Sequence, residues 1–264
     1  MKILLLKPYA AETRELELCK RVARPDTEIV FRNIAKYFPI PHVHHHYFRS
    51  KAIEGAVEQI LIAEEEGFDG VCIACGGDPA LFEARELVDI PVTSTFESAG
   101  HVACMMGQKF SVITTIDYAV PAMENLALLY GFGHKLASIR HLGVPGRELR
   151  RDVTSPETII QRVNEVARRC VEHDGAEVIV ITATLAAVLF SEKKGGPFTD
   201  MGVPVIDAMQ IGLKVLEMMV DLRKLAGIPP VSRLGLYKEP YKSEYRKFRE
   251  FYGLPLRRGL DRKE

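Results

Sequence analysis

Residues 70–81 read GVCIACGGDPAL, an apolar run that ends in Cys75 and then breaks into two glycines, an aspartate and a proline. Residues 175–189, GAEVIVITATLAAVL, repeat the design: an apolar run breaks into small polar residues that lead into a helical segment. A short apolar run bounded by turn residues is typical of a strand buried on both faces of a sheet. Both runs follow a charged helical segment and a turn. The sequence therefore predicts an internal duplication.

The same alternation continues through most of the chain. Short β-rich runs alternate with longer helical patterns, and the runs are KILLL, EIVFRNI, GVCIAC, IPVTS, FSVITT, KLASIRHLG, EVIVIT and VPVID. Helices are expected over residues 11–23, 50–66, 97–106, about 118–130, 155–173 and 207–225, with short helices from 79 and after the second quoted run. These runs are too apolar to have a solvent-exposed face, and helical segments separate them. Such a pattern indicates parallel sheets that helices cover on both sides, so the predicted class is α/β.

The duplication predicts two similar Rossmann-like lobes. We assign residues 1–96 with about 206–226 to lobe one, residues 97–205 to lobe two and residues 227–264 to a C-terminal extension. The last long helix is expected to pack back on lobe one. The extension is richer in proline, tyrosine and basic residues, and we expect it to run over the surface or to contact a second copy.

Composition and charge narrow the class of partner. The 264 residues include 35 Lys and Arg against 35 Asp and Glu, which gives no bias toward nucleic acid or acidic membranes. The apolar run before Lys7 is too short for a signal sequence or a membrane span. Five scattered cysteines in such a chain favour reduced thiols in the cytoplasm over disulfides. The expected partner is a small molecule, with a homo-oligomer as a common default.

Four strand ends are expected to carry the chemistry, because ligands bind beyond the carboxyl ends of the strands in open α/β sheets. The runs end in IAC, VTS, ITT and VIT, whose polar residues include Cys75, Ser94, Thr114, Thr115 and Thr182. Three of these four ends are rich in hydroxyl groups, which suits a crevice that binds an anion.

Cys75 is the candidate catalytic residue. Gly76 and Gly77 let the backbone approach a ligand, and a helix is expected to begin near Pro79. A thiol near a helix N-terminus has a pKa lowered from about 8.5, so that it can act as a base or a nucleophile. The alternative is that a cysteine is simply a small core residue, which is our interpretation of Cys72.

Two other patterns are candidate sites. CIAC is formally a CxxC pair, but a redox pair normally opens a helix, whereas Cys72 lies inside the apolar run. The run HVHHH places imidazoles at His42, His44, His45 and His46, without an acid or cysteine in a recognisable zinc spacing. A loop near the mouth of the crevice is the more economical interpretation, so no metal site is predicted.

The chain resembles the cofactor-independent aspartate/glutamate/hydantoin racemase superfamily, and most closely its hydantoin and allantoin racemase branch. The resemblance covers nearly the whole chain to about residue 225. It is carried by GVCIACGGDPAL, by FSVITTIDYAVPAMENLALLYGFGHKLASIR (110–140) and by GVPVIDAMQIGLKVLE (202–217). It implies two lobes related by pseudo-twofold symmetry, with the active site in the cleft between them.

The resemblance also implies a mechanism. Members of this type remove a proton from a carbon next to a carboxylate or imide carbonyl with one cysteine and return it from the opposite face with a second, without pyridoxal phosphate or metal. By position, Cys75 is the first base, and Gly76, Gly77 and Asp78 form the loop that presents donors to the substrate oxygens. Thr114, Thr115 and Thr184 match hydroxyl positions of the family, and Ser94 and Thr182 complete the predicted substrate site.

Two segments depart from the pattern. Where the family has its second cysteine, the chain reads ITATL, which places Ala183 at that position. The N-terminal segment that reads NPNxS in the hydantoin branch is KPYAAET here, which suggests a different substrate group near Lys7, Tyr9 or Thr13.

Three functions therefore stay open at this point. The first is a racemase-type isomerase that acts on an amino acid, a hydantoin or a related carbonyl compound, with Cys75 on one face and water, a threonine or a histidine on the other. The second is a one-cysteine decarboxylase or cis-trans isomerase of the same superfamily. The third is a binding protein that kept the crevice and lost catalysis. No cofactor is expected in any of them.

Overall fold

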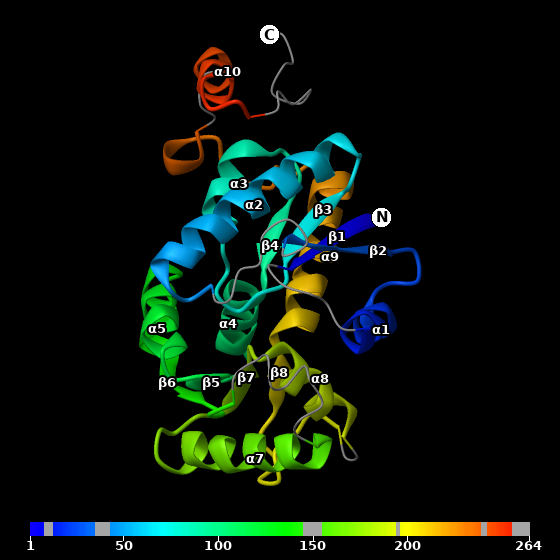
Figure 1. Ribbon diagram of the computed structural model, residues 1–264. Helices are drawn as coiled ribbons and strands as arrows, with labels where there is room; N and C mark the ends of the chain where they lie inside the picture. The colour runs from blue at the N-terminus through cyan, green and yellow to red at the C-terminus, as the bar shows by residue number, and fades with distance from the viewer. Residues whose placement is uncertain (8–12, 35–42, 145–154, 194–195, 239–241, 255–264) are drawn as a thin grey trace.

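The computed structural model describes residues 1–7, 13–34, 43–144, 155–193, 196–238 and 242–254 (Figure 1). These residues form two four-stranded parallel sheets, which confirms the predicted α/β class. The first sheet has the order β2-β1-β3-β4, with strands Glu28–Asn33, Lys2–Lys7, Gly70–Ile73 and Val92–Ser94. The second has the order β6-β5-β7-β8, with strands Leu136–His141, Phe110–Thr114, Val178–Ile181 and Val205–Asp207. The two sheets have the same strand order: in each, the second strand in the chain lies at one edge, followed by the first, the third and the fourth. This is the arrangement that a duplication predicts.

The helices agree with the sequence pattern to within a few residues. They are α1 (Thr13–Val22), α2 (His46–Glu65), α3 (Leu81–Leu87), α4 (Thr95–Met106), α5 (Ala119–Leu129), α7 (Pro156–Glu172), α8 (Thr184–Glu192), α9 (Ala208–Ala226) and α10 (Lys242–Phe251). The largest difference is the start of α2, which begins at His46 rather than near residue 50. No described helix is long and apolar enough to cross a membrane.

Strand alternation divides the apolar residues of the first sheet between two layers. Leu4, Leu6, Val71 and Ile73 belong to the core cluster that contains residues of α2 and α3. The alternate residues Ile3, Leu5 and Cys72 belong to a second cluster with residues of α1, α8 and α9. Because both faces are covered, the strands are apolar throughout, which is why their sequences show no polar face.

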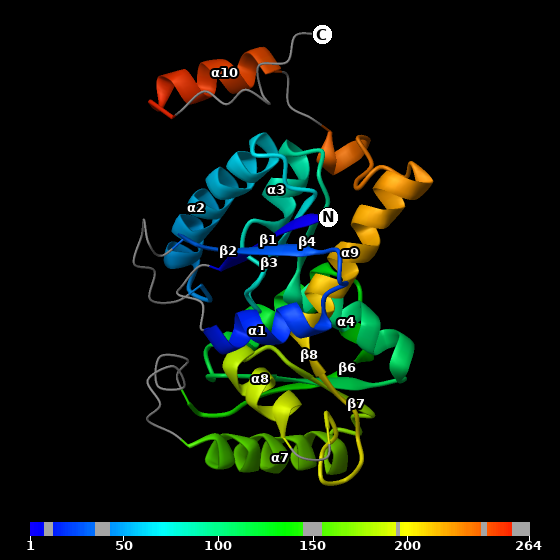
Figure 2. The same cartoon turned by 90° about the vertical axis from the view of Figure 1, so that its right-hand side faces the viewer.

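Two helices cross between the sheets. Helix α4 leaves β4 of the first sheet and packs on β7 of the second, whereas α9 leaves β8 of the second sheet and packs on β3 and β4 of the first. The two helices also pack against each other, and Figure 2 shows them between the sheets. Since each lobe contributes a helix to the other, the core is continuous across the boundary, and the carboxyl ends of β3 and β7 are held at fixed positions.

Candidate functional site

The chain turns sharply after β3, at the place where the sequence breaks into GGDP. The Cys75 amide donates to the Ile73 carbonyl at 2.9 Å, and the Asp78 amide donates to the Cys75 carbonyl at 3.0 Å. Asp78 and Ala80 both adopt left-handed backbone conformations, with φ of 42° and 71°. Non-glycine residues in this region cost free energy and tend to occur where a site needs a fixed geometry. Cys75 itself is only 1% exposed.

The Asp78 carboxylate fixes this turn to the start of α4. Its two oxygens accept hydrogen bonds from the backbone N–H groups of Phe96 at 3.1 Å and Glu97 at 2.9 Å. The Tyr130 hydroxyl, from the end of α5, donates to the same carboxylate at 3.1 Å. Burial raises the pKa of Asp78 to about 6, against the opposing effect of the two amide hydrogen bonds. The sequence placed Asp78 in a substrate-binding loop, and the structure shows that its side chain positions that loop.

Gly76 and Gly77 lie where the backbone is closely surrounded. A Cβ atom on Gly76 would lie 2.8 Å from the Cβ of Thr182, the residue that follows β7. A Cβ on Gly77 would lie 3.1 Å from a methyl group of Val43. The Arg49 guanidinium donates to the Gly77 carbonyl, and to the Asp78 carbonyl at 3.4 Å. The end of β3 therefore meets the end of β7 at Gly76, whereas Gly77 lies against the segment that leads into α2.

The end of β7 offers hydroxyl and amide groups instead of a thiol. The Thr182 amide donates to the Ile113 carbonyl of β5 at 3.0 Å, and its hydroxyl contacts the same carbonyl at 3.3 Å. Helix α8 begins directly afterwards, with Ala183 as its N-cap and no side-chain cap. Ala183 thus offers no side-chain acceptor to the first N–H groups of α8, and Thr184 is the first residue of the helix.

The remaining predicted residues lie at neighbouring strand ends. Ser94 is fully buried and close enough to the Asp78 carboxylate to favour its charged form. Thr114 is buried at the end of β5, and Thr115 follows it half-buried. Strand β5 pairs with β6 and β7 of the second sheet, so these two threonines approach the Cys75 turn from the side of Thr182. The structure thus brings Gly76, the residue after Cys75, against Thr182, while Thr114 ends the strand next to β7 and Thr115 follows it.

The histidine run joins the two lobes beside this turn. His45 is the N-cap of α2, and its ring stacks on Tyr118, with ring centroids 4.8 Å apart and planes inclined by 24°. A Cβ on Gly77 would lie 3.6 Å from Cε1 of His44. The run is thus part of the wall around the turn and leads into a helix. His42 and Tyr9 lie outside the described residues, and no group of three metal-ligating side chains occurs among those described.

Cys72 and Cys75 lie in different layers. Cys72 belongs to the cluster that contains residues of α1 and α9, and Cys75 to the cluster that contains residues of α2. Burial raises the pKa of Cys72 to about 12, with a hydrogen bond to Thr93 opposing the shift. The prediction that Cys72 is a core residue is confirmed, and the two thiols do not form a pair on one face.

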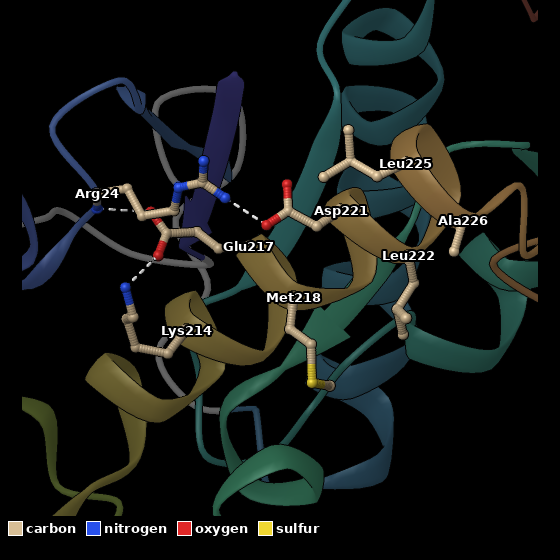
Figure 3. A pocket seen from close by; sticks show the side chains of 8 residues that line it. All are labelled: Arg24, Lys214, Glu217, Met218, Asp221, Leu222, Leu225 and Ala226. Atoms are coloured by element: carbon tan, nitrogen blue, oxygen red, sulfur yellow. Dashed lines mark hydrogen bonds and ion pairs between the residues drawn. The ribbon is translucent and has the colours of Figure 1, made fainter.

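Sequence reasoning missed three residues that contact the turn: Arg49 of α2, Tyr130 at the end of α5 and Val43, which precedes α2. No local pattern distinguishes them, because each is far from residue 75 in the sequence. A separate hollow of about 450 Å³ lies along α9 and contains none of the predicted residues (Figure 3). Its charged groups are paired with one another: Arg24 with Asp221, and Lys214 with Glu217. We therefore place the candidate site at the meeting of β3 and β7.

Known proteins are similar to this chain in sequence and in fold. The Asp/Glu/Hydantoin racemase family profile matches residues 10–216. A hydantoin racemase of Pseudomonas sp. (strain NS671) is 35% identical over 249 residues, which cover 93% of the chain and 94% of that protein. An allantoin racemase from Pseudomonas fluorescens is similar in structure, with a TM-score of 0.77, 27% identity and coverage of 91% of this chain and 97% of that one. An allantoin racemase from Klebsiella pneumoniae has a TM-score of 0.74, 29% identity and coverage of 91% and 94%.

Proposed function

Because the chain belongs to the Asp/Glu/hydantoin racemase family, we propose that it inverts the configuration of a carbon next to an imide carbonyl, with Cys75 as the acid–base thiol. The substrate class we favour is a 5-substituted hydantoin or allantoin, since similar proteins are named hydantoin and allantoin racemases. The family and its racemase activity are shown by the comparisons, and the substrate and the site residues are our proposal.

The observation that carries the proposal is the contact between the two strand ends. Cys75 follows β3, and the neighbouring Gly76 lies against Thr182 at the end of β7. A small planar ring at this junction would have the thiol on one side. The open N–H groups of α8 would lie near its oxygens, together with the hydroxyls of Thr182 and Thr184. We propose that Ser94, Thr114 and Thr115 complete this substrate site.

The chemistry follows from these groups. The Cys75 thiolate takes the proton, and the electron pair of the C–H bond moves into the carbonyl, whose oxygen becomes negative. Backbone N–H groups aimed at such an oxygen stabilise the charge as it develops. Return of a proton to the opposite face inverts the carbon. Each step is a proton transfer, so this mechanism needs no electron-accepting cofactor.

A second function is favoured by one residue. The family resemblance places Ala183 at the position of the second cysteine, and alanine cannot carry a proton. A decarboxylase that releases carbon dioxide from a substituted malonate needs only one proton donor, which Cys75 could supply. This one-cysteine reaction is the alternative to inversion.

The domain division is also a proposal, with residues 1–96 and about 206–226 in lobe one, 97–205 in lobe two and 227–264 as an extension. In its support, β8 pairs with β7 in the second sheet, whereas α9 packs on the first sheet. The chain thus returns to lobe one close to Asp207.

Proton NMR in deuterium oxide tests the proposed function. We expect loss of the α-proton signal with L- and D-5-benzylhydantoin or with allantoin, at rates well above the uncatalysed exchange. In Cys75→Ala the rate should fall at least about 100-fold, the usual size of a general-base contribution. Cys104→Ala, which changes a half-buried thiol on α4, serves as the matched control and should keep full activity.

Three outcomes distinguish the candidates. Exchange that is unchanged in Cys75→Ala would contradict the role of that thiol. Carbon dioxide release from phenylmalonate, without exchange of any hydantoin, would favour the decarboxylase. Absence of both reactions, with tight binding of a hydantoin, would favour a binding protein.

A further inference from the structure

We propose that Lys7 is the acid–base group that serves the substrate face opposite Cys75, in the role left vacant by Ala183. This inference rests on the proposed function, because it concerns the second proton transfer of an inversion. The need for such a group is plain from the sequence, since alanine at 183 has no titratable atom. The candidate must lie near the strand ends, reach the start of α8 and carry an exchangeable proton.

Lys7 lies at the same edge of the sheet as Cys75. It is the last residue of β1, the strand that pairs with β3. The pairing continues past the end of β3, because the Ala74 amide donates to the Leu6 carbonyl at 2.8 Å. Cys75 is the next residue. Lys7 therefore ends β1, and Cys75 lies two residues past the end of the neighbouring strand β3.

The two side chains lie in different layers. Lys7 follows Ile3 and Leu5 in the strand alternation, on the side of α1, and its ammonium pairs with Glu15 of α1. Cys75 packs in the cluster of Leu4 and Leu6, on the side of α2. A substrate bound at the strand ends would thus meet the thiol from one side of the sheet and the ammonium from the other.

Helix packing places the partner of Lys7 beside α8. Helices α1 and α8 pack against each other, and both views show α8 next to α1 (Figures 1 and 2). Val188 of α8 and Cys19 of α1 lie in one core cluster. Glu15, which pairs with Lys7, lies one helical turn before Cys19 on the same face of α1. The Lys7–Glu15 pair therefore lies on the side of the first sheet where α1 meets α8, the helix that begins after Ala183.

The burial of this pair indicates a role besides stability. Lys7 is 1% exposed and Glu15 is 2% exposed. Removing two charges from water is costly, and a buried ion pair is often no more stabilising than apolar residues of the same volume. The other titratable groups in this layer are Cys19, Cys72 and Asp207, whose pKa values are all raised, chiefly by burial. Cys72 lies inside β3, and neither Cys19 nor Asp207 ends a strand beside Cys75, so Lys7 is the group placed to reach the substrate.

The proton balance is simple. In one direction the Cys75 thiolate takes the α-proton, and the Lys7 ammonium gives a proton to the opposite face of the carbanion. The enzyme is left with a Cys75 thiol and a neutral Lys7 amine, which catalyse the reverse inversion or exchange protons with water. Glu15 is a positioning residue, because it accepts a hydrogen bond from Lys7 and fixes its direction.

The test replaces the pair as a unit. Removal of Lys7 alone would leave the Glu15 charge buried without compensation, so the variant is Lys7→Met with Glu15→Met. With L- and D-5-benzylhydantoin in deuterium oxide, we expect inversion to fall at least about 100-fold. Exchange of one enantiomer by Cys75 should continue with retained optical rotation. Lys20→Met, which changes an exposed lysine of the same helix, is the control and should invert both enantiomers at the wild-type rate.

A rescue separates a proton-transfer role from a structural one. Adding Ala183→Cys to the double variant supplies a thiol at the start of α8, and we expect inversion to rise at least about tenfold. The inference is overturned if the double variant inverts within threefold of wild type, or if it loses exchange of both enantiomers and the added thiol restores nothing. A wild-type protein that neither exchanges nor inverts these hydantoins or allantoin overturns the proposed function as well.

Discussion

The connection from β3 to α3 has seven residues, Ala74 to Ala80, whereas the connection from β7 to α8 has only two, Thr182 and Ala183. The longer connection contains two left-handed residues and is held by the Asp78 carboxylate and the Arg49 guanidinium. Neither α3 nor α8, the helices that follow the two connections, has a side-chain cap at its N-terminus. Both connections occupy equivalent places in sheets of the same strand order.

In the proposed mechanism, this difference means that two copies of one unit contribute different groups to the reaction. The turn after β3 would hold the Cys75 thiol in place, because a proton-transfer group must be held in a defined direction. The β7 end keeps the first amides of a helix open, which suits an oxygen that becomes negative. In the same proposal, the second copy contributes polar backbone groups and no thiol.

Of the changes that would distinguish the end of β3 from the end of β7, the largest effect on the free energy of unfolding is expected at Asp78. Its pKa is about 6 in the folded protein and 3.8 for a free carboxyl, so its contribution to folding is fully present below about pH 4 and is lost as the pH rises through 6. The shift corresponds to about 3 kcal/mol. In Asp78→Asn this pH dependence should disappear. Urea unfolding of both proteins at pH 4 and pH 7 measures it.

Asp207, whose pKa is also raised to about 6, makes a similar contribution to the pH dependence of stability. Because wild type and Asp78→Asn both contain Asp207, its contribution cancels in the difference between the two proteins. Asparagine tolerates the left-handed backbone at this position. A stability difference between the two proteins that stays constant from pH 4 to pH 7 would contradict the assignment.

Gly76→Ala tests the contact between the two ends. The new Cβ would lie 2.8 Å from the Thr182 Cβ, so the ends of β3 and β7 must move apart. We expect the free energy of unfolding to fall by about 1–3 kcal/mol. The exchange rate should fall at least about tenfold, because a shift of about 1 Å disturbs the alignment of the thiol.

Gly67→Ala is the matched control for that experiment. Gly67 has a φ of 76°, and a Cβ added there would have no neighbouring atom within 4 Å among the described residues, so alanine costs stability through backbone strain alone. Equal loss of activity in the two variants would show that the contact with Thr182 is not what matters.

The smallest effect is expected at Ala183, and its sign is opposite. Serine is a better N-cap than alanine, so Ala183→Ser should stabilise the protein by about 1 kcal/mol, as measured by thermal unfolding. The same hydroxyl would compete with a substrate for the first amides of α8, so KM should rise. Ser155→Ala removes the existing cap of α7 and should destabilise by a similar amount. No gain in stability from Ala183→Ser would show that these amides are already satisfied.

Much of the site was predictable because its signals are local. The break after IAC predicted the turn that follows β3, and the apolar runs predicted the strands of both sheets. The partners of Asp78 were not predictable. Tyr130 is 52 residues away and lies in the other half of the chain, and no periodicity connects the two.

By itself, the sequence determined the α/β class, the two copies of the strand and helix pattern, the thiol at one strand end and its absence at the other. Each of these depends on residue types at short spacing, which hydrophobic periodicity and turn chemistry encode directly. Only the tertiary structure decided that Asp78 caps α4, that Gly76 lies against Thr182 and that Lys7 is buried with Glu15. Those relations arise from the packing of α1, α4 and α8 across the boundary between the sheets, and such packing sums many contacts between residues far apart in the chain.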